Sequence, residues 1–244
     1  MALWTLLSQS ELIELNHLYQ PRMPVWPTHP KFVLAENESY VGGDGNYNCQ
    51  LVMGDHCGTH VDSPSHFIPH GKTIEQVDVR QLIGRGIRID VRHTAPGHTF
   101  GEKEITQWES QHGEIGSDDI VIFHTGWDEK WARRPDQAAF LSRWPGLSAS
   151  GADYLISKGV KVFGTDALSL DAFNSDGNPV HQIVLGSDRL IIENLTNLSR
   201  LPPCFTFIAL PLRIENASAS PVRAIALVTP QDSPYEVNST SSGL

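Results

Sequence analysis

The sequence predicts one α/β domain built around a mixed β-sheet. Short apolar runs rich in β-branched residues, typical of buried strands, are interspersed with segments whose apolar residues recur at helical spacing. This mixture without strict alternation favours a layered α/β or α+β domain over a helical bundle. The 244 residues fit one domain of ordinary size, and neither an internal repeat nor a long linker divides them. We therefore expect a domain over residues 1–232 and a polar tail over residues 233–244.

The expected elements follow in chain order. Strands are predicted where apolar and β-branched runs lie between turn residues, at 31–35, 48–53, 86–91, 119–124, 160–164, 189–193, 205–212 and 222–228. Helices are predicted where apolar residues stand three or four positions apart, at 5–15, 73–83, 102–111, 135–143 and 148–158. Thr73 and Ser148 stand where a side-chain oxygen can cap the first turn of a helix.

Composition excludes several classes of partner. The formal net charge is −10 and the isoelectric point is near 5.5, so no basic surface is expected for a nucleic-acid backbone. No segment approaches the ~20 apolar residues of a membrane span. The first fifteen residues lack the basic start and cleavage site of a signal peptide. The three cysteines form no CxxC pair, which argues against a disulfide framework and a thiolate metal site. We expect a cytoplasmic enzyme with a small-molecule substrate.

The segment 55–66, DHCGTHVDSPSH, concentrates groups that bind divalent metals and transfer protons. His56, His60 and Asp62 share one parity, so in an extended chain their side chains point to the same face. In a straight strand the two histidine backbones would lie ~13 Å apart, near the limit for holding one ion. We therefore expect a bend at Gly58, where a glycine tolerates unusual backbone angles. Pro64 should end the strand because it has no amide hydrogen to donate.

Two further features lie outside this segment. His181 precedes Glu193 by twelve residues, and both can complete a metal shell. Glu193 ends an apolar run, where a buried carboxylate needs a cation or hydrogen-bond partners; an exposed acid at a strand end is the alternative. Prolines on both sides hold Trp26 in an extended loop, where its ring can stack on a planar substrate or pack in the core.

Several other polar residues are candidates for the lining of a pocket without a spacing argument behind them. Cys57, inside the motif but of opposite parity, is expected to be a small core residue. The remaining pocket candidates are Asp166, Ser169 and Asp171, which follow an apolar run and alternatively only shape the turn, and the histidines His29, His70 and His124.

These residues carry a family resemblance. The chain resembles the metal-dependent cyclase superfamily, which includes bacterial-type kynurenine formamidase and isatin hydrolase and whose hallmark is HxGTHxDxPxH. Here the motif reads HCGTHVDSPSH, with every fixed position filled. Supporting similarity covers about residues 14–230, in NHLYQPRMPVWP, GTDALSLD, PVHQIVL, IIENLTNL, ALPL and SPVRAIAL. The resemblance implies a swivelling α/β domain around a mixed sheet, usually in homodimers or larger oligomers such as tetramers.

The resemblance also implies a metal centre. It makes His56, His60 and Asp62 ligands of a first ion, with Asp62 bridging to a second. It makes His181 a ligand of the second ion and Glu193 a carboxylate that contacts both. Imidazole with carboxylate suits zinc and manganese alike, so the sequence leaves the metal and the number of ions, one or two, open.

The implied reaction is hydrolysis of a carbonyl–nitrogen bond, in a formamide or cyclic amide of an aromatic or planar molecule, by metal-activated water. The resemblance gives His66 the role of proton donor and acceptor, and Trp26 contact with the aromatic substrate. A ring-closing or dehydrating enzyme, a lactone hydrolase and a metal-binding protein without catalysis stay open as alternatives. PTHP stands where relatives often have PGDP, and an insertion-like segment, WARRPDQAAFLSRWPG, leaves the branch of the family undecided.

Overall fold

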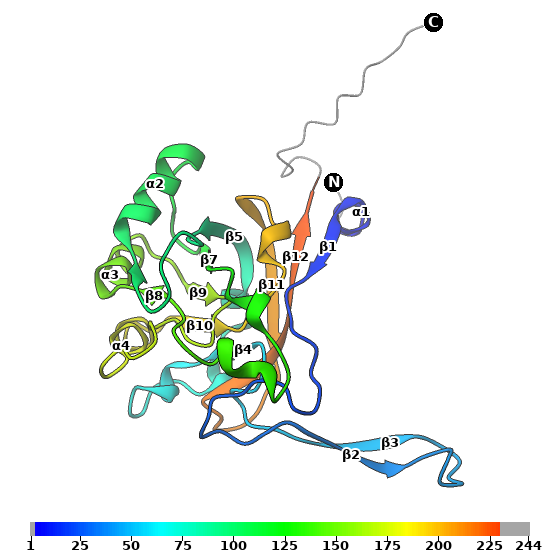
Figure 1. Ribbon diagram of the computed structural model, residues 1–244. Helices are drawn as coiled ribbons and strands as arrows, with labels where there is room; N and C mark the ends of the chain where they lie inside the picture. Colours follow the sequence, from blue (N-terminus) through cyan, green and yellow to red (C-terminus); the bar gives the residue numbers. More distant parts are fainter. Residues whose placement is uncertain (1–2, 230–244) are drawn as a thin grey trace, which may run out of the picture.

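The computed structural model describes residues 3–229 (Figure 1). Its centre is an eight-stranded mixed sheet in the order β1-β12-β11-β5-β7-β9-β10-β4, and β4 also pairs with β12, so the sheet closes into a barrel. The predicted α/β domain with a mixed sheet is confirmed. The strands of this sheet are β1 (Glu11–Glu14), β4 (His60–Asp62), β5 (Ile83–Asp90), β7 (Ile120–His124), β9 (Val162–Thr165), β10 (Leu190–Glu193), β11 (Cys204–Pro211) and β12 (Ala219–Val228).

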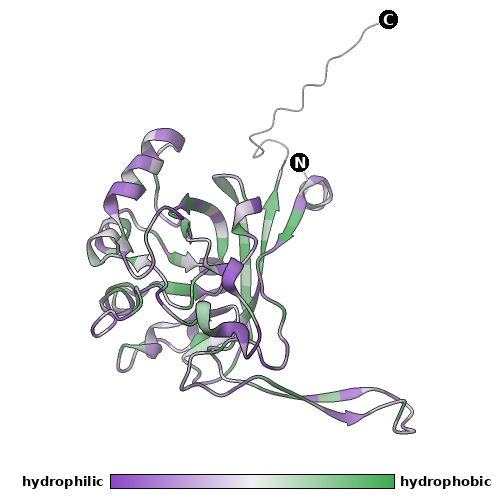
Figure 2. Cartoon of the chain, viewed as in Figure 1, coloured by the Kyte–Doolittle hydropathy of each residue, from purple (hydrophilic) through white to green (hydrophobic). Residues whose placement is uncertain are grey.

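The core lies on both faces of the parallel strands β5, β7, β9 and β10. Alternate residues of β7 point to opposite faces, so Ile120 and Ile122 join the core inside the barrel, whereas Val121 and Phe123 pack under the helices. The helices on that outer side are α2 (Glu102–His112), α3 (Ala149–Ser157) and α4 (Pro179–Gly186) (Figure 1). Coverage on both faces explains the apolar runs at 120–123 in β7 and 190–192 in β10, and β10 is green in Figure 2.

Three smaller parts lie outside the barrel. The strands β2 (Val33–Glu38) and β3 (Asn48–Val52) form a hairpin that projects from the body (Figure 1), and β6 (Thr99–Phe100) pairs with β8 (Gly146–Leu147). The N-terminal helix α1 spans Leu3–Gln9. No helix among residues 3–229 is long and apolar enough to cross a membrane. The expected tail at 233–244 lies outside the described residues.

The predicted helix at 5–15 is wrong in its second half. Helix α1 ends at Gln9, and β1 pairs with β12 from Glu11 onward. The apolar side chains of Ile13 and Leu15 are buried in the barrel core. Alternating burial along the segment and backbone pairing with the edge of β12 therefore favour a strand over a helix.

Two other predicted helices are wrong. Over 73–83 the chain forms two short 3₁₀ turns, Ile74–Gln76 and Val79–Leu82, before β5 begins. The carboxylate of Asp78 accepts a hydrogen bond from the Arg80 amide and starts the second turn, which breaks a continuous helix. Over 135–143 only one 3₁₀ turn forms, at Asp136–Ala139.

Helix caps follow the sequence in part. Ser148 caps α3 as expected, since its hydroxyl accepts a hydrogen bond from the Gly151 amide at 3.2 Å. The Thr73 hydroxyl instead donates a hydrogen bond to the Glu75 carboxylate and caps no backbone amide. Helix α4 was not predicted, because its eight residues are too short for a clear helical period.

Candidate active site

The motif segment bends at the expected glycine. Gly58 has φ +64°, a left-handed conformation, and a Cβ at this position would lie 2.8 Å from the Tyr19 ring and 2.9 Å from the Met23 methyl. After the bend, only His60–Asp62 pairs in the sheet. The bend brings the His56 and His60 rings to 5.1 Å between centroids.

The residues after and within the motif also take the expected places. Pro64 opens a 3₁₀ turn directly after the strand, as its missing amide hydrogen requires. Cys57 is buried in an apolar cluster with Met23 and Phe32, so its prediction as a core residue is confirmed.

Substituting Gly58 tests the bend. Gly58→Ala is expected to lower the free energy of unfolding by about 1–3 kcal/mol, because alanine is strained at positive φ and its Cβ meets Tyr19 and Met23. Urea denaturation of the two proteins measures the difference. Gly43 provides the control, because it also has positive φ but a Cβ there would meet no atom within 4 Å, so Gly43→Ala should cost less. Equal losses at both positions would contradict a role for close packing at Gly58.

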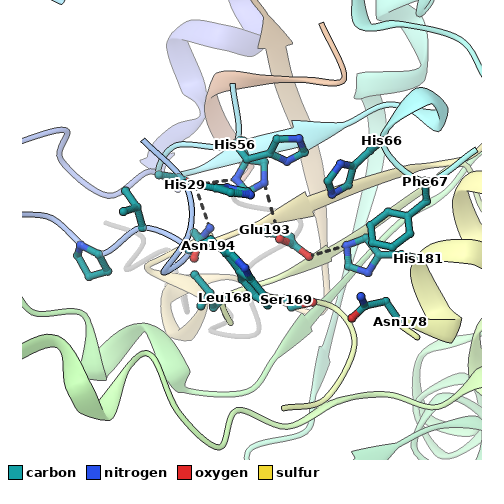
Figure 3. A pocket seen from close by; sticks show the side chains of 15 residues that line it. His29, His56, His66, Phe67, Leu168, Ser169, Asn178, His181, Glu193 and Asn194 are labelled. Atoms are coloured by element: carbon teal, nitrogen blue, oxygen red, sulfur yellow. Dashed lines mark hydrogen bonds and ion pairs between the residues drawn. The ribbon is translucent and has the colours of Figure 1, made fainter. Parts of the chain in front are cut away.

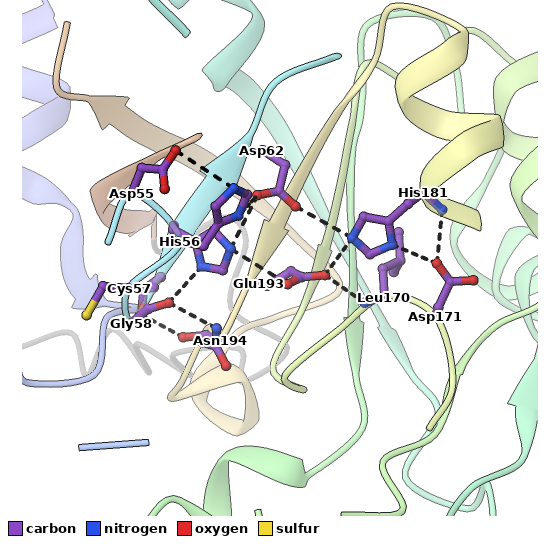
Figure 4. A network of polar contacts seen from close by, with 12 residues as sticks. Asp55, His56, Cys57, Gly58, Asp62, Leu170, Asp171, His181, Glu193 and Asn194 are labelled. Atoms are coloured by element: carbon purple, nitrogen blue, oxygen red, sulfur yellow. Dashed lines mark hydrogen bonds and ion pairs between the residues drawn. The ribbon is translucent and has the colours of Figure 1, made fainter. Parts of the chain in front are cut away.

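Strand pairing and helix α4 gather the predicted metal ligands (Figure 4). His60 lies directly across from Glu193 in the β4–β10 pair, and its Nε2 is 3.7 Å from Glu193 Oε2 and 3.3 Å from Asp62 Oδ1. From α4, His181 places its Nε2 3.2 Å from Glu193 Oε1 and 3.6 Å from Asp62 Oδ2. His56 places its Nδ1 2.7 Å from Asp62 Oδ1. All five side chains therefore surround one small volume.

The buried carboxylate of Asp62 indicates a cation in that volume. Asp62 is fully buried, and neither of its oxygens has a hydrogen-bond partner among the described residues, although nitrogens of three histidines lie close. A buried charge without hydrogen bonds is costly. Lone pairs of nitrogen and oxygen that face one another are the arrangement a divalent ion requires. The residues present thus fit a metal centre.

The electrostatics agree with this arrangement. Burial lowers the pKa of His60, but the carboxylates of Asp62 and Glu193 outweigh it and raise the pKa to about 9. Burial likewise opposes the charge on His181, yet the nearby carboxylates, Asp171 first among them, hold its pKa well above the usual range. Burial raises the pKa of Asp62, but His56 and His60 lower it well below its usual range. The carboxylates of the site therefore stabilise positive charge on the groups that they surround.

His66 differs from the other histidines of the site. Its ring lies 4.0 Å from that of His56 between centroids, and 6.0 Å from that of His181. Burial lowers its pKa to about 4, with His56 and His181 acting in the same direction against Asp62. His66 is therefore neutral near pH 7 and can accept a proton.

A cavity of about 230 Å³ opens beside these residues (Figure 3). Trp26 lines it, as predicted, and its ring also packs edge-on against Trp144 at 5.9 Å. His29 and Ser169, both sequence candidates, line it too. The cavity thus combines apolar walls with a polar end formed by His56, His60, His66, His181 and Glu193.

Comparisons with known proteins place the chain in a family. A family model described as a putative cyclase matches residues 13–172. The chain belongs to this family. It is 31% identical to an isatin hydrolase of Roseibium aggregatum, with 89% of this chain and 92% of that protein covered. It is 32% identical to a kynurenine formamidase of Sphingopyxis alaskensis, with 88% and 97% covered.

Solved structures agree. An isatin hydrolase bound to the product analogue thioisatinate superposes with a TM-score of 0.84 at 28% identity, over 94% of this chain and all of that one. Isatin hydrolase A from Labrenzia aggregata, bound to benzyl benzoate, gives a TM-score of 0.83 at 28% identity, over 91% and 95% of the two chains. The cyclase-family chain described here is accordingly a hydrolase with a cyclase-type fold.

Hydrogen bonds outside the ligand set orient its histidines in this cyclase-family enzyme. His60 Nδ1 lies 2.8 Å from the Gly58 carbonyl, and His181 Nδ1 lies 2.6 Å from Asp171 Oδ2. Each bond leaves Nε2 free to face the carboxylates. His56 Nε2 lies 3.0 Å from the hydroxyl of Ser218, which leaves its Nδ1 toward Asp62.

Asp171 has a positioning role that differs from the expected place in the pocket lining. It accepts hydrogen bonds from the Val180 and His181 amides at the start of α4 as well as contacting the His181 ring. The same carboxylate therefore fixes both the helix start and the ring orientation.

Removing this carboxylate should weaken the metal centre. Asp171→Ala is expected to lower metal affinity by about 10–100-fold, because His181 loses its orienting bond. Titration with Zn²⁺ or Mn²⁺ by isothermal calorimetry gives the affinity. Asp171→Asn keeps one acceptor and should recover part of the loss. Wild-type affinity in the alanine variant would exclude this role.

Other sequence candidates lie elsewhere. His70 is exposed at positive φ, and neither it nor His124 lines the cavity. Asp166 is buried and accepts hydrogen bonds from the Thr125 and Gly126 amides, so it braces the loop after β7. Asp166 therefore shapes the turn, which was the alternative to a place in the pocket lining.

Several residues that line the cavity were not singled out from the sequence. Phe67 and Leu168 add apolar wall, and Asn178 lies at the start of α4. Asn194 donates a hydrogen bond to the Gly58 carbonyl at 3.0 Å and so supports the bend. Only Asn194 could have been suspected, because it directly follows Glu193.

Proposed function

We propose that this enzyme hydrolyses the carbonyl–nitrogen bond of a formamide or cyclic amide carried by an aromatic or planar small molecule. The observation that supports this most is the set of five converging side chains around the unpartnered Asp62, at the end of an apolar cavity of about 230 Å³. The relatives named isatin hydrolase and kynurenine formamidase support the same class of substrate.

The ligand set proposed for a divalent cation is His56, His60, Asp62, His181 and Glu193. When bound, such a cation would lower the pKa of water and polarise the substrate carbonyl. The two carboxylates supply negative charge, and the three imidazoles supply neutral nitrogen donors suited to zinc or manganese. Glu193 Oε1 also accepts a hydrogen bond from the Leu170 amide at 2.9 Å, which fixes the carboxylate in the site.

His66 is proposed as the general acid and base. It lies at the polar end of the cavity, and burial lowers its pKa so that it is neutral near pH 7. Its ring can therefore accept a proton from the attacking water and return it to the leaving nitrogen. Trp26, Phe67 and Leu168 form the apolar wall that would hold the planar part of the substrate and exclude water.

Product analysis tests the proposal. Metal-loaded enzyme is incubated separately with N-formylkynurenine and with isatin, and products are identified by mass spectrometry. Release of formate from the first, or gain of one water by the second, is the expected result. Loss of water from a substrate would instead indicate ring closure or dehydration. We further propose a homo-oligomer, dimer or tetramer, as the working form.

A further inference from the structure

His56 faces the carboxylates of the site through a different nitrogen from the other two histidines. His60 and His181 turn Nε2 toward Asp62, at 3.3 and 3.6 Å from its oxygens. His56 instead turns Nδ1 to Asp62 Oδ1, at 2.7 Å. A neutral imidazole binds a cation through the nitrogen that carries no hydrogen. As a ligand, His56 must therefore carry its hydrogen on Nε2, whereas His60 and His181 must carry theirs on Nδ1.

The groups that face the non-ligating nitrogens are not equivalent. Nδ1 of His60 lies 2.8 Å from the Gly58 carbonyl. Nδ1 of His181 lies 2.6 Å from the Asp171 carboxylate. Carbonyl and carboxylate oxygens only accept, so both of these contacts place the hydrogen on Nδ1. At His56 the neighbour of Nε2 is a hydroxyl, which can donate or accept and so fixes no hydrogen by itself.

Asp55 removes this ambiguity. Asp55 and Asp62 lie on opposite sides of the His56 ring (Figure 4). The Ser218 hydroxyl lies 3.0 Å from His56 Nε2 and donates its hydrogen to Asp55 Oδ2 at 2.9 Å. A hydroxyl has one hydrogen, so while it donates to Asp55 it can only accept from His56. Nε2 then carries the hydrogen of the ring, and the lone pair of Nδ1 faces Asp62.

Backbone contacts hold Ser218 in this position. Its carbonyl accepts hydrogen bonds from the Ser63 amide and the Ser63 hydroxyl, both at 2.9 Å. Ser218 directly precedes β12, the strand that pairs with β4 of the motif. Asp55 Oδ2 is 3.9 Å from His56 Nε2, which is too far for a direct hydrogen bond. The hydroxyl is therefore the link between Asp55 and the ring.

We propose that Asp55 is a positioning residue for the metal centre, which holds the Ser218 hydroxyl as an acceptor and so makes His56 offer Nδ1 to the cation. Without Asp55 the hydroxyl is free to donate to Nε2. That bond stabilises the tautomer whose Nδ1 carries a hydrogen and cannot ligate. Groups that orient ligating histidines typically raise metal affinity by about 10–100-fold. The inference rests on the proposed function in one respect, namely that His56 is a metal ligand.

The zinc affinity of the full chain tests the proposal. Competition with a fluorescent chelator gives the dissociation constants of the wild type, Asp55→Ala, Asp55→Asn, Ser218→Ala and the double variant Asp55→Ala/Ser218→Ala. Both positions are half-buried, and circular dichroism with melting of the metal-free proteins identifies folded variants. Asp188→Ala is the control, because it also removes one negative charge, from an exposed residue that pairs with Lys72.

Asp55→Ala and Ser218→Ala should each weaken zinc binding by about 10-fold or more, and the control should bind zinc as the wild type does. The double variant should bind no more than about twofold more weakly than Ser218→Ala, because without the hydroxyl Asp55 has nothing to orient. Asp55→Asn should stay within about threefold of the wild type, since its carboxamide oxygen can still accept from Ser218. An effect of charge alone would instead make Asp55→Asn as weak as Asp55→Ala.

Nitrogen-15 NMR of the histidine side chains in the zinc-loaded wild type gives a readout independent of affinity. His56 should carry hydrogen on Nε2 and zinc on Nδ1, with the reverse at His60 and His181. Wild-type affinity in Asp55→Ala, additive losses in the double variant, an asparagine variant as weak as the alanine variant, or zinc on Nε2 of His56 would overturn the proposal. A wild type that binds no zinc would overturn the metal centre itself, and this inference with it.

Discussion

His66→Ala is expected to lower kcat by about 10²- to 10⁴-fold, the usual contribution of a general acid and base. Metal content should stay at the wild-type level, because the five proposed ligands lie 2.7–3.7 Å from one another and hold the ion without His66. A ring nitrogen of His66 lies within 4.8 Å of the nearest atoms of Asp62 and His56, so a loss of metal in this variant would instead make His66 a ligand. KM should change little, because the apolar wall of the cavity is intact. Initial rates over a range of substrate concentrations, with metal analysis of the same sample, measure both effects.

The matched control is His70→Ala. His70 stands four residues further along the chain but is exposed and does not line the cavity. Its removal should leave kcat within about twofold of the wild type, since surface substitutions away from a site are usually near neutral. If His66→Ala retained wild-type kcat, the assignment of the proton transfer to His66 would be wrong.

Asp62→Asn is expected to abolish metal binding. Within residues 3–229, Asp62 is the one carboxylate that contacts all three histidines of the proposed ligand set, and it is the most buried member of that set. Asparagine keeps the shape but removes the charge and turns one oxygen into an NH₂ donor, which cannot ligate a cation. The measured metal per chain should fall from at least one ion to below about 0.1, and activity should fall with it, because metal and activity are lost together.

Asp188→Asn controls for loss of one negative charge. Asp188 is exposed at the surface and pairs with Lys72, so its substitution should leave metal content unchanged. Dialysis against a chelator before reconstitution gives both proteins the same starting state. Stoichiometric metal in the Asp62→Asn protein would show that the ion lies elsewhere.

The sequence predicts the chemistry of the site better than its geometry. The motif carries His56, His60 and Asp62 in seven residues. The bend that brings the two histidine rings together needs glycine, because φ is positive and a Cβ would meet Tyr19 and Met23. The position of Glu193 opposite His60 follows from the register of β10 against β4, a pairing between residues 133 positions apart that no local pattern encodes.

The errors in the fold have a common physical cause. Residues 11–15 and 73–83 have apolar spacing compatible with a helix. In the first segment, strand pairing with β12 stabilises an extended conformation. In the second, apolar side chains are buried in the barrel core from short turns. Helical propensity is a weak preference that tertiary contacts override. The projecting β2–β3 hairpin was predicted as two strands, yet its exposure on both faces could not be read from a run of apolar residues.

The most direct test is the metal content of purified, reconstituted enzyme, measured by plasma mass spectrometry, alongside turnover of isatin and N-formylkynurenine by the same sample. We expect one or two zinc or manganese ions per chain, with turnover of at least one substrate that is lost on chelation and restored by the metal. No bound metal after reconstitution, with Asp62 intact, would contradict the proposed metal centre.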